Sequence, residues 1–275
     1  MKIADLFKVE GYGAIVTGGA SGLGLGFVEA MAENGARVTM LDVNEETIGK
    51  EVERLRGEGF DVDGKVVDVR DHAALDAAFE EVVQKYGRLD VTFANAGIDS
   101  GPGFVEGWVG ERTRNDAGAI ENYEDERWQR VIDINLTGAF ATVRAAARHM
   151  KPRKFGRIIA TTSMAATHTE PAIGVAYMTA KAGLAHFVRN TGLELAAYNI
   201  TVNAIAPGFF ITNIGGGHAH NPDLQKLVSK YIPMHRVGFP DDMKGLALFL
   251  ASPASAYITG QQIGIDGGWS LGAAD

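Results

Sequence analysis

Tyr177 and Lys181 stand four positions apart in the stretch AYMTAK, residues 176–181. If this stretch is helical, residues i and i+4 lie one above the other on the same face, so the ammonium lies beneath the phenol. A free phenol has a pKa near 10, and a neighbouring cation can lower that pKa by about 1–3 units. The spacing therefore predicts a tyrosine that could act as a general acid or base near neutral pH.

A glycine-rich turn, TGGASGLG at 17–24, lies between a predicted strand and a predicted helix. Backbone N–H groups at a helix N-terminus are unpaired, and the helix dipole there favours phosphate. Phe27 stands where the G-x-G-x-x-G pattern needs its third glycine, so the spacing is T-G-x-x-x-G-x-G through Gly18, Gly22 and Gly24. We expect the turn to bind a dinucleotide phosphate, although a turn without a ligand would also use glycine.

Two aspartates end the next two predicted strands. Asp42 follows Gly24 by 18 residues, about where a carboxylate accepts hydrogen bonds from an adenosine ribose. A carboxylate there repels a 2′-phosphate, and the glycine turn offers Ser21 rather than Arg or Lys beside it, so we expect NAD rather than NADP. Asp42 could instead only cap the following helix. Asp68, followed by Val69, could meet the adenine amino group.

The elements that must position these residues alternate along the chain. Short runs rich in Val and Ile predict strands at 13–17, 37–41, 64–67, 91–94, 157–160, 201–205 and 262–265. Amphipathic patterns between them predict helices at 23–34, 45–57, 72–86, 126–149, 176–198 and 241–251. This alternation predicts an α/β fold, a single Rossmann-type domain over residues 1–275. Its doubly wound parallel sheet has about seven strands, with helices on both faces.

Two segments break the alternation. Residues 99–125 are Gly-rich, charged and non-periodic, and they are long for a loop in a compact domain. Their larger side chains could reach over an active site or lie in a subunit contact; these are Trp108, Glu111, Arg112 and Arg114. Residues 208–240 contain three consecutive glycines, 215–217, next to an amphipathic segment near 222–231, which predicts a substrate lid.

Composition excludes several classes of function. The chain of 275 residues carries a net charge of −8 and no cluster of Lys and Arg, which argues against a nucleic-acid partner. It has no cysteine, so neither a disulfide nor a thiolate metal site is possible. His218 and His220 form a pair without a carboxylate partner, so we expect no metal. No apolar run is long enough for a membrane span, and the charged N-terminal stretch is unlike a secretory signal, so we expect a cytoplasmic protein without a membrane partner.

Seven motifs in a fixed order make the chain resemble the short-chain dehydrogenase/reductase family over nearly its whole length. They are TGxxxGxG at 17–24, Asp68-Val69, NAG at 95–97, IDINLTG at 132–138, IIATTS at 158–163, Tyr177-x-x-x-Lys181 and APG at 206–208. One departure is Ala160, which stands where the family often has Asn. The resemblance implies hydride transfer between NAD(H) and a secondary alcohol or ketone.

The resemblance also implies a role for each catalytic residue. Tyr177 would be the general acid/base, helped by Lys181, which would also bind the nicotinamide ribose. Ser163 would donate a hydrogen bond to the substrate oxygen, and Asn135 would anchor a water that relays protons to Lys181. The alternatives are that Ser163 caps a helix, Asn135 is a satisfied buried amide and Tyr177 is a half-buried aromatic residue.

Further cofactor contacts follow from the same resemblance. Asn95, Ala96 and Gly97 would lie on the adenosine side. Pro207, Gly208 and Thr212 would contact the nicotinamide. With the residues already named, the expected cofactor site comprises Gly18, Ser21, Gly22, Leu23, Gly24, Asp42, Asp68, Val69, Asn95, Ala96, Gly97, Tyr177, Lys181, Pro207, Gly208 and Thr212.

The expected substrate site is mostly apolar, which favours a fairly hydrophobic alcohol or ketone. Its candidate lining residues are Ser163, Met164, His168, Ile173, Phe209, Phe210, Ile214, Leu227 and Tyr231, although Leu227 and Tyr231 could only seat the lid. Other possible activities are reduction of 3-oxoacyl thioesters and dehydrogenation of sugars or polyols. A dinucleotide-sensing protein would not need Tyr177, Lys181 and Ser163 together, and nucleotide-sugar epimerases and dehydratases are usually longer chains. The resemblance further implies a homotetramer, a dimer of dimers built through the helices at 126–149 and 176–198.

Overall fold

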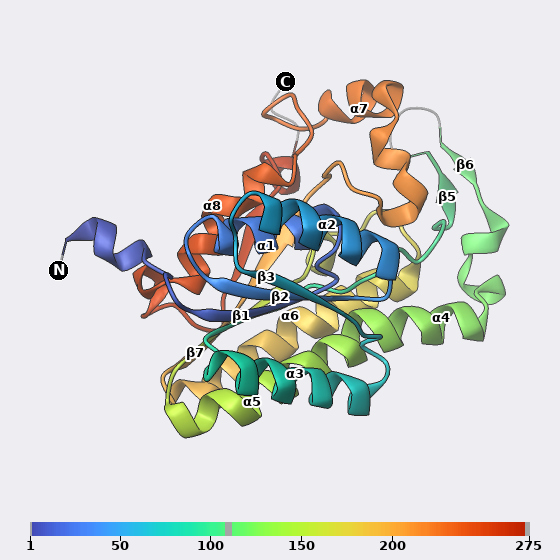
Figure 1. The fold of residues 1–275 in the computed structure, drawn as a ribbon. Coiled ribbons are helices and arrows are strands. Elements are labelled where there is room, and N and C mark those ends of the chain that lie inside the picture. Colours follow the sequence, from blue (N-terminus) through green and yellow to red (C-terminus); the bar gives the residue numbers. More distant parts are fainter. Residues whose placement is uncertain (1, 108–111, 273–275) are drawn as a thin grey trace.

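Seven parallel strands form the central sheet of the computed structural model, which describes residues 2–107 and 112–272 (Figure 1). The strand order is β3-β2-β1-β4-β7-β8-β9, which reverses direction between β1 and β4. The bounds are β1 Gly13–Thr17, β2 Arg37–Asp42, β3 Val62–Val66, β4 Val91–Ala94, β7 Gly156–Thr161, β8 Ile200–Pro207 and β9 Gln262–Ile265. The predicted doubly wound Rossmann-type sheet is confirmed, and its switch point between β1 and β4 is where such sheets bind ligands.

Helices cover both faces of the sheet (Figure 1). Helices α1, α2 and α8 lie on one face, and α3, α5 and α6 lie on the other. Strand β1 shows why both faces are buried, because Ala14 and Val16 belong to the core under the first group and Ile15 to the core under the second. The bounds are α1 Gly22–Ala32, α2 Glu45–Gly57, α3 His72–Tyr86, α4 Asp125–Ile132, α5 Ala139–Met150, α6 Val175–Ala196, α7 Pro222–Ser229 and α8 Asp241–Ala251.

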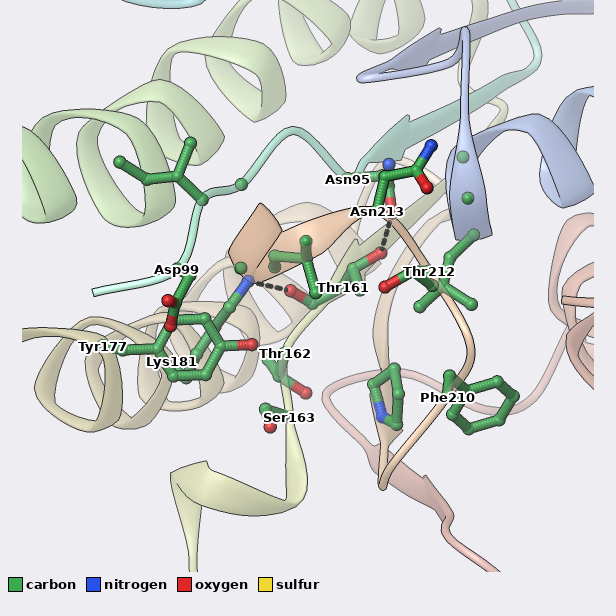
Figure 2. A pocket seen from close by; sticks show the side chains of 18 of the residues that line it. Asn95, Asp99, Thr161, Thr162, Ser163, Tyr177, Lys181, Phe210, Thr212 and Asn213 are labelled. Atoms are coloured by element: carbon green, nitrogen blue, oxygen red, sulfur yellow. Dashed lines mark hydrogen bonds between the residues drawn. The ribbon is translucent and has the colours of Figure 1, made fainter. Parts of the chain in front are cut away.

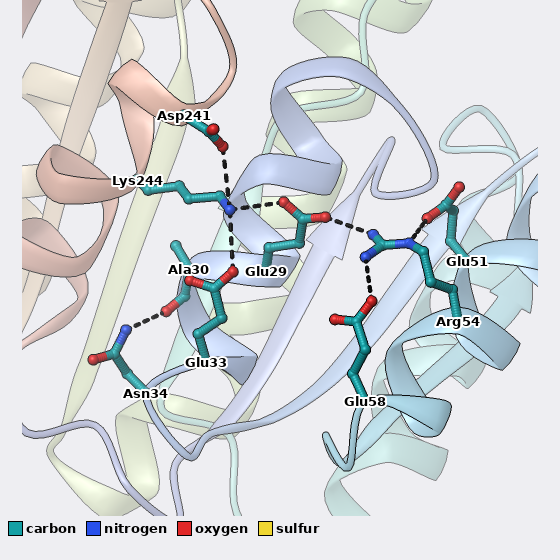
Figure 3. A network of polar contacts seen from close by, with 9 residues as sticks. All are labelled: Glu29, Ala30, Glu33, Asn34, Glu51, Arg54, Glu58, Asp241 and Lys244. Atoms are coloured by element: carbon teal, nitrogen blue, oxygen red, sulfur yellow. Dashed lines mark hydrogen bonds and ion pairs between the residues drawn. The ribbon is translucent and has the colours of Figure 1, made fainter.

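An ion-pair network ties the three helices of the first face together (Figure 3). Glu29 of α1 accepts from Arg54 of α2 at 2.5 Å and from Lys244 of α8 at 2.9 Å. Arg54 also pairs with Glu51 and Glu58 on its own helix. Because several partly buried charges share the contact, the network is worth more than an isolated surface pair, and it holds α1 against the sheet behind the glycine turn.

The predicted element bounds are close to those observed, with two differences. The third strand spans Val62–Val66 rather than 64–67, because Val62 already pairs with Val38 of β2. The predicted helix 126–149 is interrupted by a π-helical segment, Asp133–Gly138, between α4 and α5. Asn135 lies in this segment, and its side chain is hydrogen-bonded to Ile98 in the loop after β4. A side-chain contact of this kind accompanies the widened turn.

The segment 99–125 contains a short antiparallel hairpin that periodicity did not predict. Its strands are β5 Val105–Glu106 and β6 Thr113–Arg114. Trp108 and Glu111, expected to reach over the active site or a subunit contact, lie outside the described residues. Within the described ranges, no helix is long and apolar enough to cross a bilayer.

Candidate active site

The carboxyl ends of β1, β4, β7 and β8 surround a cavity of about 380 Å³ (Figure 2). Its walls come from the glycine turn, the loop after β4, the end of β7, helix α6 and the loop after β8. The residues that line it are Ser21, Gly22, Leu23, Gly24, Asn95, Gly97, Ile98, Asp99, Thr161, Thr162, Ser163, Tyr177, Lys181, Pro207, Gly208, Phe210, Thr212, Asn213, Ile214 and Gly215. Most residues expected to bind cofactor are therefore brought together.

The glycine turn has the geometry of an anion cradle. Gly18 and Gly22 have φ values of +63° and +54°, a region that favours glycine. A Cβ on Gly24 would lie 1.9 Å from the carbonyl oxygen of Gly18, so only glycine fits there. Asn95 locks the turn, since its Nδ2 donates to the carbonyls of Thr17 and Gly18 at 3.1 Å each. The turn thus leaves its backbone open at the N-terminus of α1, as a bound diphosphate requires.

Asp42 lies at the end of β2 beside the glycine turn. Its carboxylate accepts hydrogen bonds from the backbone N–H groups of Ala20 at 3.1 Å, Val43 at 2.8 Å and Asn44 at 3.2 Å. The side chain of Asn44, not that of Asp42, caps helix α2. The alternative reading of Asp42 as the helix cap is therefore wrong, and the carboxylate is held against the turn.

Asp68 and Val69 do not line the cavity. Arg70 donates to both carboxylate oxygens of Asp68, and this contact lowers the pKa of that carboxyl group. Val69 packs where a Cβ on Gly138 would lie, 2.5 Å from its Cγ2. An adenine contact from Asp68 would thus compete with its ion pair, while Val69 fixes the π-helical segment.

Tyr177 and Lys181 lie on adjacent turns of α6, as the spacing predicts (Figure 2). The Lys181 Nζ atom is 5.5 Å from the centre of the Tyr177 ring and donates to the carbonyl oxygen of Thr161 at 2.7 Å. Lys181 is only 3% exposed. This contact anchors the ammonium at the closed end of the cavity, where β7 ends.

The expected low pKa of Tyr177 is not what the protein alone produces. Burial raises the pKa of Tyr177 to about 12, a hydrogen bond with Ser163 opposes that rise, and the Asp99 carboxylate adds to it. Burial also lowers the pKa of Lys181 to about 8. Desolvation disfavours the charged form of each group, and it is the largest cause of both shifts.

Ser163 and Asn135 both have structural roles, but only Ser163 lines the cavity. Ser163 caps the 3-10 helix Met164–Ala166 by accepting from the N–H of Ala165 at 3.1 Å, which leaves its hydroxyl hydrogen free to donate. Asn135, in the π-helical segment, donates to the carbonyls of Ile98 at 3.0 Å and Val131 at 3.1 Å. Its Oδ1 accepts from the N–H of Ile98 at 3.2 Å.

Asn135 therefore acts on the loop after β4 rather than on the cavity, which it does not line. Its amide hydrogens are both used, so its side chain is the satisfied buried amide of the alternative reading. That Asn135 anchors a water which relays protons to Lys181 stays a prediction. A Cβ on Gly97 would lie 2.7 Å from Asn135 Oδ1, so the amide also requires glycine at that position.

A second, larger cavity of about 760 Å³ adjoins the first and shares Ser163 and Tyr177 with it. Seven of the predicted substrate residues line it, namely Ser163, Met164, His168, Ile173, Phe209, Phe210 and Ile214. Leu227 and Tyr231 do not, and they are 37% and 42% exposed. Leu224 of α7 lines the cavity in their place. It lies one helical turn before Leu227.

The segment 99–125 forms the wall opposite α7. Gly103 N–H donates to the carbonyl of Ala172 at 2.9 Å, and Pro102 pairs with Ile173 in an isolated bridge. Arg112 pairs with Glu170 at 3.6 Å, and Arg114 lies over the Phe104 ring at 5.3 Å. Neither Arg112 nor Arg114 lines either cavity, so the two roles predicted for the large side chains of this segment, at the active site or in a subunit contact, stay predictions.

Arg127 of α4 holds this wall in place. Its guanidinium donates to the carbonyls of Ser100, Pro102 and Ala117. It also lies over the Tyr123 ring at 4.3 Å. One side chain thus joins both ends of the segment to the helix that follows it.

Sequence reasoning missed several lining residues. They are Asp99, Thr161, Thr162, Asn213, Glu106, Leu224 and Trp269. Asp99 could have been found, because it follows the NAG motif by two positions, whereas Glu106 and Trp269 reach the site only through tertiary folding. The His220 Nε2 and Asn213 Oδ1 atoms are 3.0 Å apart, and no group of three or more possible metal ligands occurs in the described ranges.

Comparison with known proteins places this geometry in one family. Residues 18–270 match the family model described as enoyl-(acyl carrier protein) reductase. The 3-oxoacyl-[acyl-carrier-protein] reductase FabG of Chlamydia pneumoniae is 36% identical over 92% of this chain and 95% of its own. A 3alpha-hydroxysteroid dehydrogenase of Mediterraneibacter gnavus is 33% identical over 92% of this chain and 95% of its own.

A solved structure agrees with the sequence relatives. A gluconate 5-dehydrogenase from Burkholderia cenocepacia, in complex with NADP and tartrate, superposes with a TM-score of 0.85 at 31% identity, covering 98% of this chain and 99% of its own. With the sheet order, the glycine turn and the Tyr177–Lys181 pair, these matches show that the chain belongs to the short-chain dehydrogenase/reductase family of oxidoreductases.

Proposed function

We propose that the protein is an NAD-dependent dehydrogenase or ketoreductase of a fairly hydrophobic secondary alcohol or ketone, with Tyr177 as its general acid/base. The observation that carries the proposal is that Ser163 and Tyr177 line both cavities. One cavity has a glycine cradle and the other a largely apolar wall. A reacting carbon at their junction would be within reach of both hydroxyl groups.

The fit of a dinucleotide rests on the cradle, where a Cβ on Gly24 or Gly97 would clash with neighbouring atoms and where both glycines line the cavity. Residues of the first cavity, from Ser21 to Thr212, would hold it. Bound there, a nicotinamide dinucleotide supplies the acceptor or donor of hydride.

This chain's own residues would handle the proton. In oxidation, Tyr177 takes the proton from the substrate hydroxyl, and in reduction it returns a proton to the carbonyl oxygen. Ser163 donates a hydrogen bond to the same oxygen. The Lys181 ammonium would stabilise the phenolate electrostatically, and the hydrogen bond with Ser163 opposes the burial that raises the pKa of Tyr177 to about 12.

The preference for NAD rests on charge at the ribose end. Asp42 presents a carboxylate whose oxygens already face the glycine turn through Ala20 N–H. A 2′-phosphate placed there would meet like charge, and the neighbours Ser21 and Val43 are neutral. The gluconate 5-dehydrogenase structure contains NADP, so the preference is proposed from the residues of this chain and not from that relative.

The apolar wall favours a hydrophobic substrate over a polyol. The relatives are named as reductases of 3-oxoacyl-[acyl-carrier-protein], a hydroxysteroid dehydrogenase and a gluconate dehydrogenase. Met164, Ile173 and Trp269 among the lining residues suit the first two better than the third. Reduction of 3-oxoacyl thioesters is therefore the second candidate function.

Three further properties are proposed with this function. Residues 208–240, which supply one wall of the substrate cavity, serve as a lid that closes on substrate. The protein forms a homotetramer through the outer faces of α5 and α6. It works in the cytoplasm.

Absorbance of NADH tests the proposed activity directly. Purified protein is incubated with NAD or NADP and a panel of aliphatic and aryl secondary alcohols, hydroxysteroids, hydroxyacyl thioesters and polyols. Turnover of the apolar alcohols with NAD is expected. A clear preference for small polyols would overturn the substrate class.

A further inference from the structure

The charged residues that line the larger cavity are mostly acidic. Among the described lining residues, three are carboxylates, and none is Lys or Arg. They are Asp99, Glu106 and Glu170. Asp99 and Glu106 are exposed and Glu170 is partly buried, so they act on a charged ligand through long-range attraction or repulsion, which added salt weakens.

Asp99 has the most direct position of the three. It lines both cavities, and its carboxylate lies beside the Tyr177 ring (Figure 2). On the opposite wall, a Cβ on Gly215 would lie 3.4 Å from Asp99 Oδ2, so the carboxylate reaches across to the 208–240 segment. A substrate that presents its carbon to Tyr177 would therefore lie within the electrostatic reach of this carboxylate, which also acts on the Tyr177 hydroxyl.

The other two carboxylates differ in their pairing. Glu170 is partly neutralised by Arg112 at 3.6 Å, and its Oε1 also accepts from Ala172 N–H at 3.3 Å. Asp99 and Glu106 make no hydrogen bond or ion pair with another residue in the described part of the chain. Among the described residues, these two carboxylates therefore line the substrate cavity without a paired cation.

The positive groups nearby do not cancel them. Lys181 lines only the smaller cavity, where its Nζ is buried against the Thr161 carbonyl. His168 and His218 line the larger cavity. The described residues of the larger cavity thus combine three carboxylates with two histidines and no Lys or Arg.

We propose that the substrate carries no anionic group near its reacting carbon, and that Asp99, assisted by Glu106, selects uncharged or cationic secondary alcohols and ketones against anionic ones. The inference rests on the proposed dehydrogenase function and narrows its substrate class. It sets the chain apart from an enzyme of sugar acids, whose carboxylate would lie beside Asp99.

Three aryl alcohols of similar shape test this selection. They are 1-phenylethanols that carry a para tert-butyl, trimethylammonium or sulfonate group, so that charge changes while size is nearly constant. The wild-type protein is assayed with NAD at pH 8 for kcat/KM. We expect the cation to exceed the anion by on the order of tenfold.

Asp99→Asn and the double variant Asp99→Asn/Glu106→Gln remove the charges with little change of shape. The cation-to-anion ratio of kcat/KM should fall several-fold in the first and approach one in the second. Glu53→Gln, an exposed carboxylate on α2, is the matched control and should keep the wild-type ratio. An anion that equals the cation in the wild type, or an unchanged ratio in the double variant, overturns the proposal.

Binding separates this inference from the proposed function. The dissociation constants of the three matching ketones are measured by calorimetry on the protein with NADH, so chemistry is not required. Weakest binding of the sulfonate, relieved in the double variant, supports the selection even if no alcohol is oxidised. Oxidation of the tert-butyl alcohol with equal binding of all three ketones would instead support the function and refute the selection.

Discussion

The ammonium of Lys181 lies 5.5 Å from the centre of the Tyr177 ring, with Lys181 buried and Tyr177 partly buried where it lines both cavities. Burial disfavours the charged form of each, raising the pKa of Tyr177 to about 12 and lowering that of Lys181 to about 8. Perturbed groups of this kind concentrate at functional sites. Near neutral pH the buried Lys181 ammonium therefore costs stability, whereas the neutral Tyr177 phenol does not.

Lys181→Met should stabilise the protein while abolishing turnover. The pKa of Lys181 is depressed on folding, so the folded state holds this proton less tightly and stability rises with pH from about 8 towards about 10.5. At pH 7 the buried charge costs on the order of 3 kcal/mol. In the variant, the Thr161 carbonyl loses the hydrogen bond from Lys181. This loss destabilises the variant by about 1–2 kcal/mol and so reduces its net gain.

Thermal unfolding at pH 7 and pH 10 measures this difference. A net gain of about 1–2 kcal/mol is expected for the variant at pH 7, shrinking at pH 10. A variant less stable than wild type at both pH values would show that the buried ammonium is not a cost.

Alcohol oxidation should rise with pH and carbonyl reduction should fall, because Tyr177 acts as phenolate in one direction and as phenol in the other. The Asp99 carboxylate raises the pKa of Tyr177. Asp99→Asn should therefore move the ascending limb of the oxidation profile to lower pH. Profiles of kcat for both proteins check this, and a limb that stays in place or moves upward would contradict it.

Much of the fold was accessible from sequence because its signals are local. Val- and Ile-rich runs such as 13–17 and 37–41 predict buried parallel strands, and the Tyr177–Lys181 spacing predicts one helical face. The motifs then place the cofactor side of the site. These features depend on a few neighbouring residues, so periodicity and spacing suffice.

The rest depends on contacts between distant segments. The π-helical turn at Asp133–Gly138 accompanies the bonds between Asn135 and Ile98, which helical periodicity cannot show. Leu227 and Tyr231 have the right spacing for a lid, but the rotation of α7 presents Leu224 instead. The raised pKa of Tyr177 reflects burial, which no local pattern measures.

Asp42→Ala should weaken NAD binding and narrow its advantage over NADP by about tenfold. NAD should bind more weakly because the variant lacks the charged acceptor for the ribose hydroxyls. NADP should bind more tightly because the variant no longer repels the 2′-phosphate. Ratios of kcat/KM for the two cofactors, with Glu53→Gln as a surface control, give the answer. An unchanged ratio of kcat/KM between NAD and NADP would show that Asp42 does not select the cofactor at the adenosine ribose.

Arg127→Met should loosen the wall built by residues 99–125. Its guanidinium holds the carbonyls of Ser100, Pro102 and Ala117, so its loss should cost about 2 kcal/mol of local stability. We expect a several-fold rise in KM with a smaller change in kcat, together with faster proteolysis within the segment. Arg130→Met, an exposed arginine on the same helix, is the control. Equal behaviour of the two variants would show that the clamp does not position the wall.

The most direct test of the central claim is the turnover of Tyr177→Phe, which keeps the ring and removes only the hydroxyl. The account predicts that kcat/KM with the best alcohol of the panel falls by about 10²–10⁴-fold, while calorimetry shows NADH binding close to wild type. Activity within tenfold of wild type in the variant would contradict the assignment of Tyr177 as the acid/base.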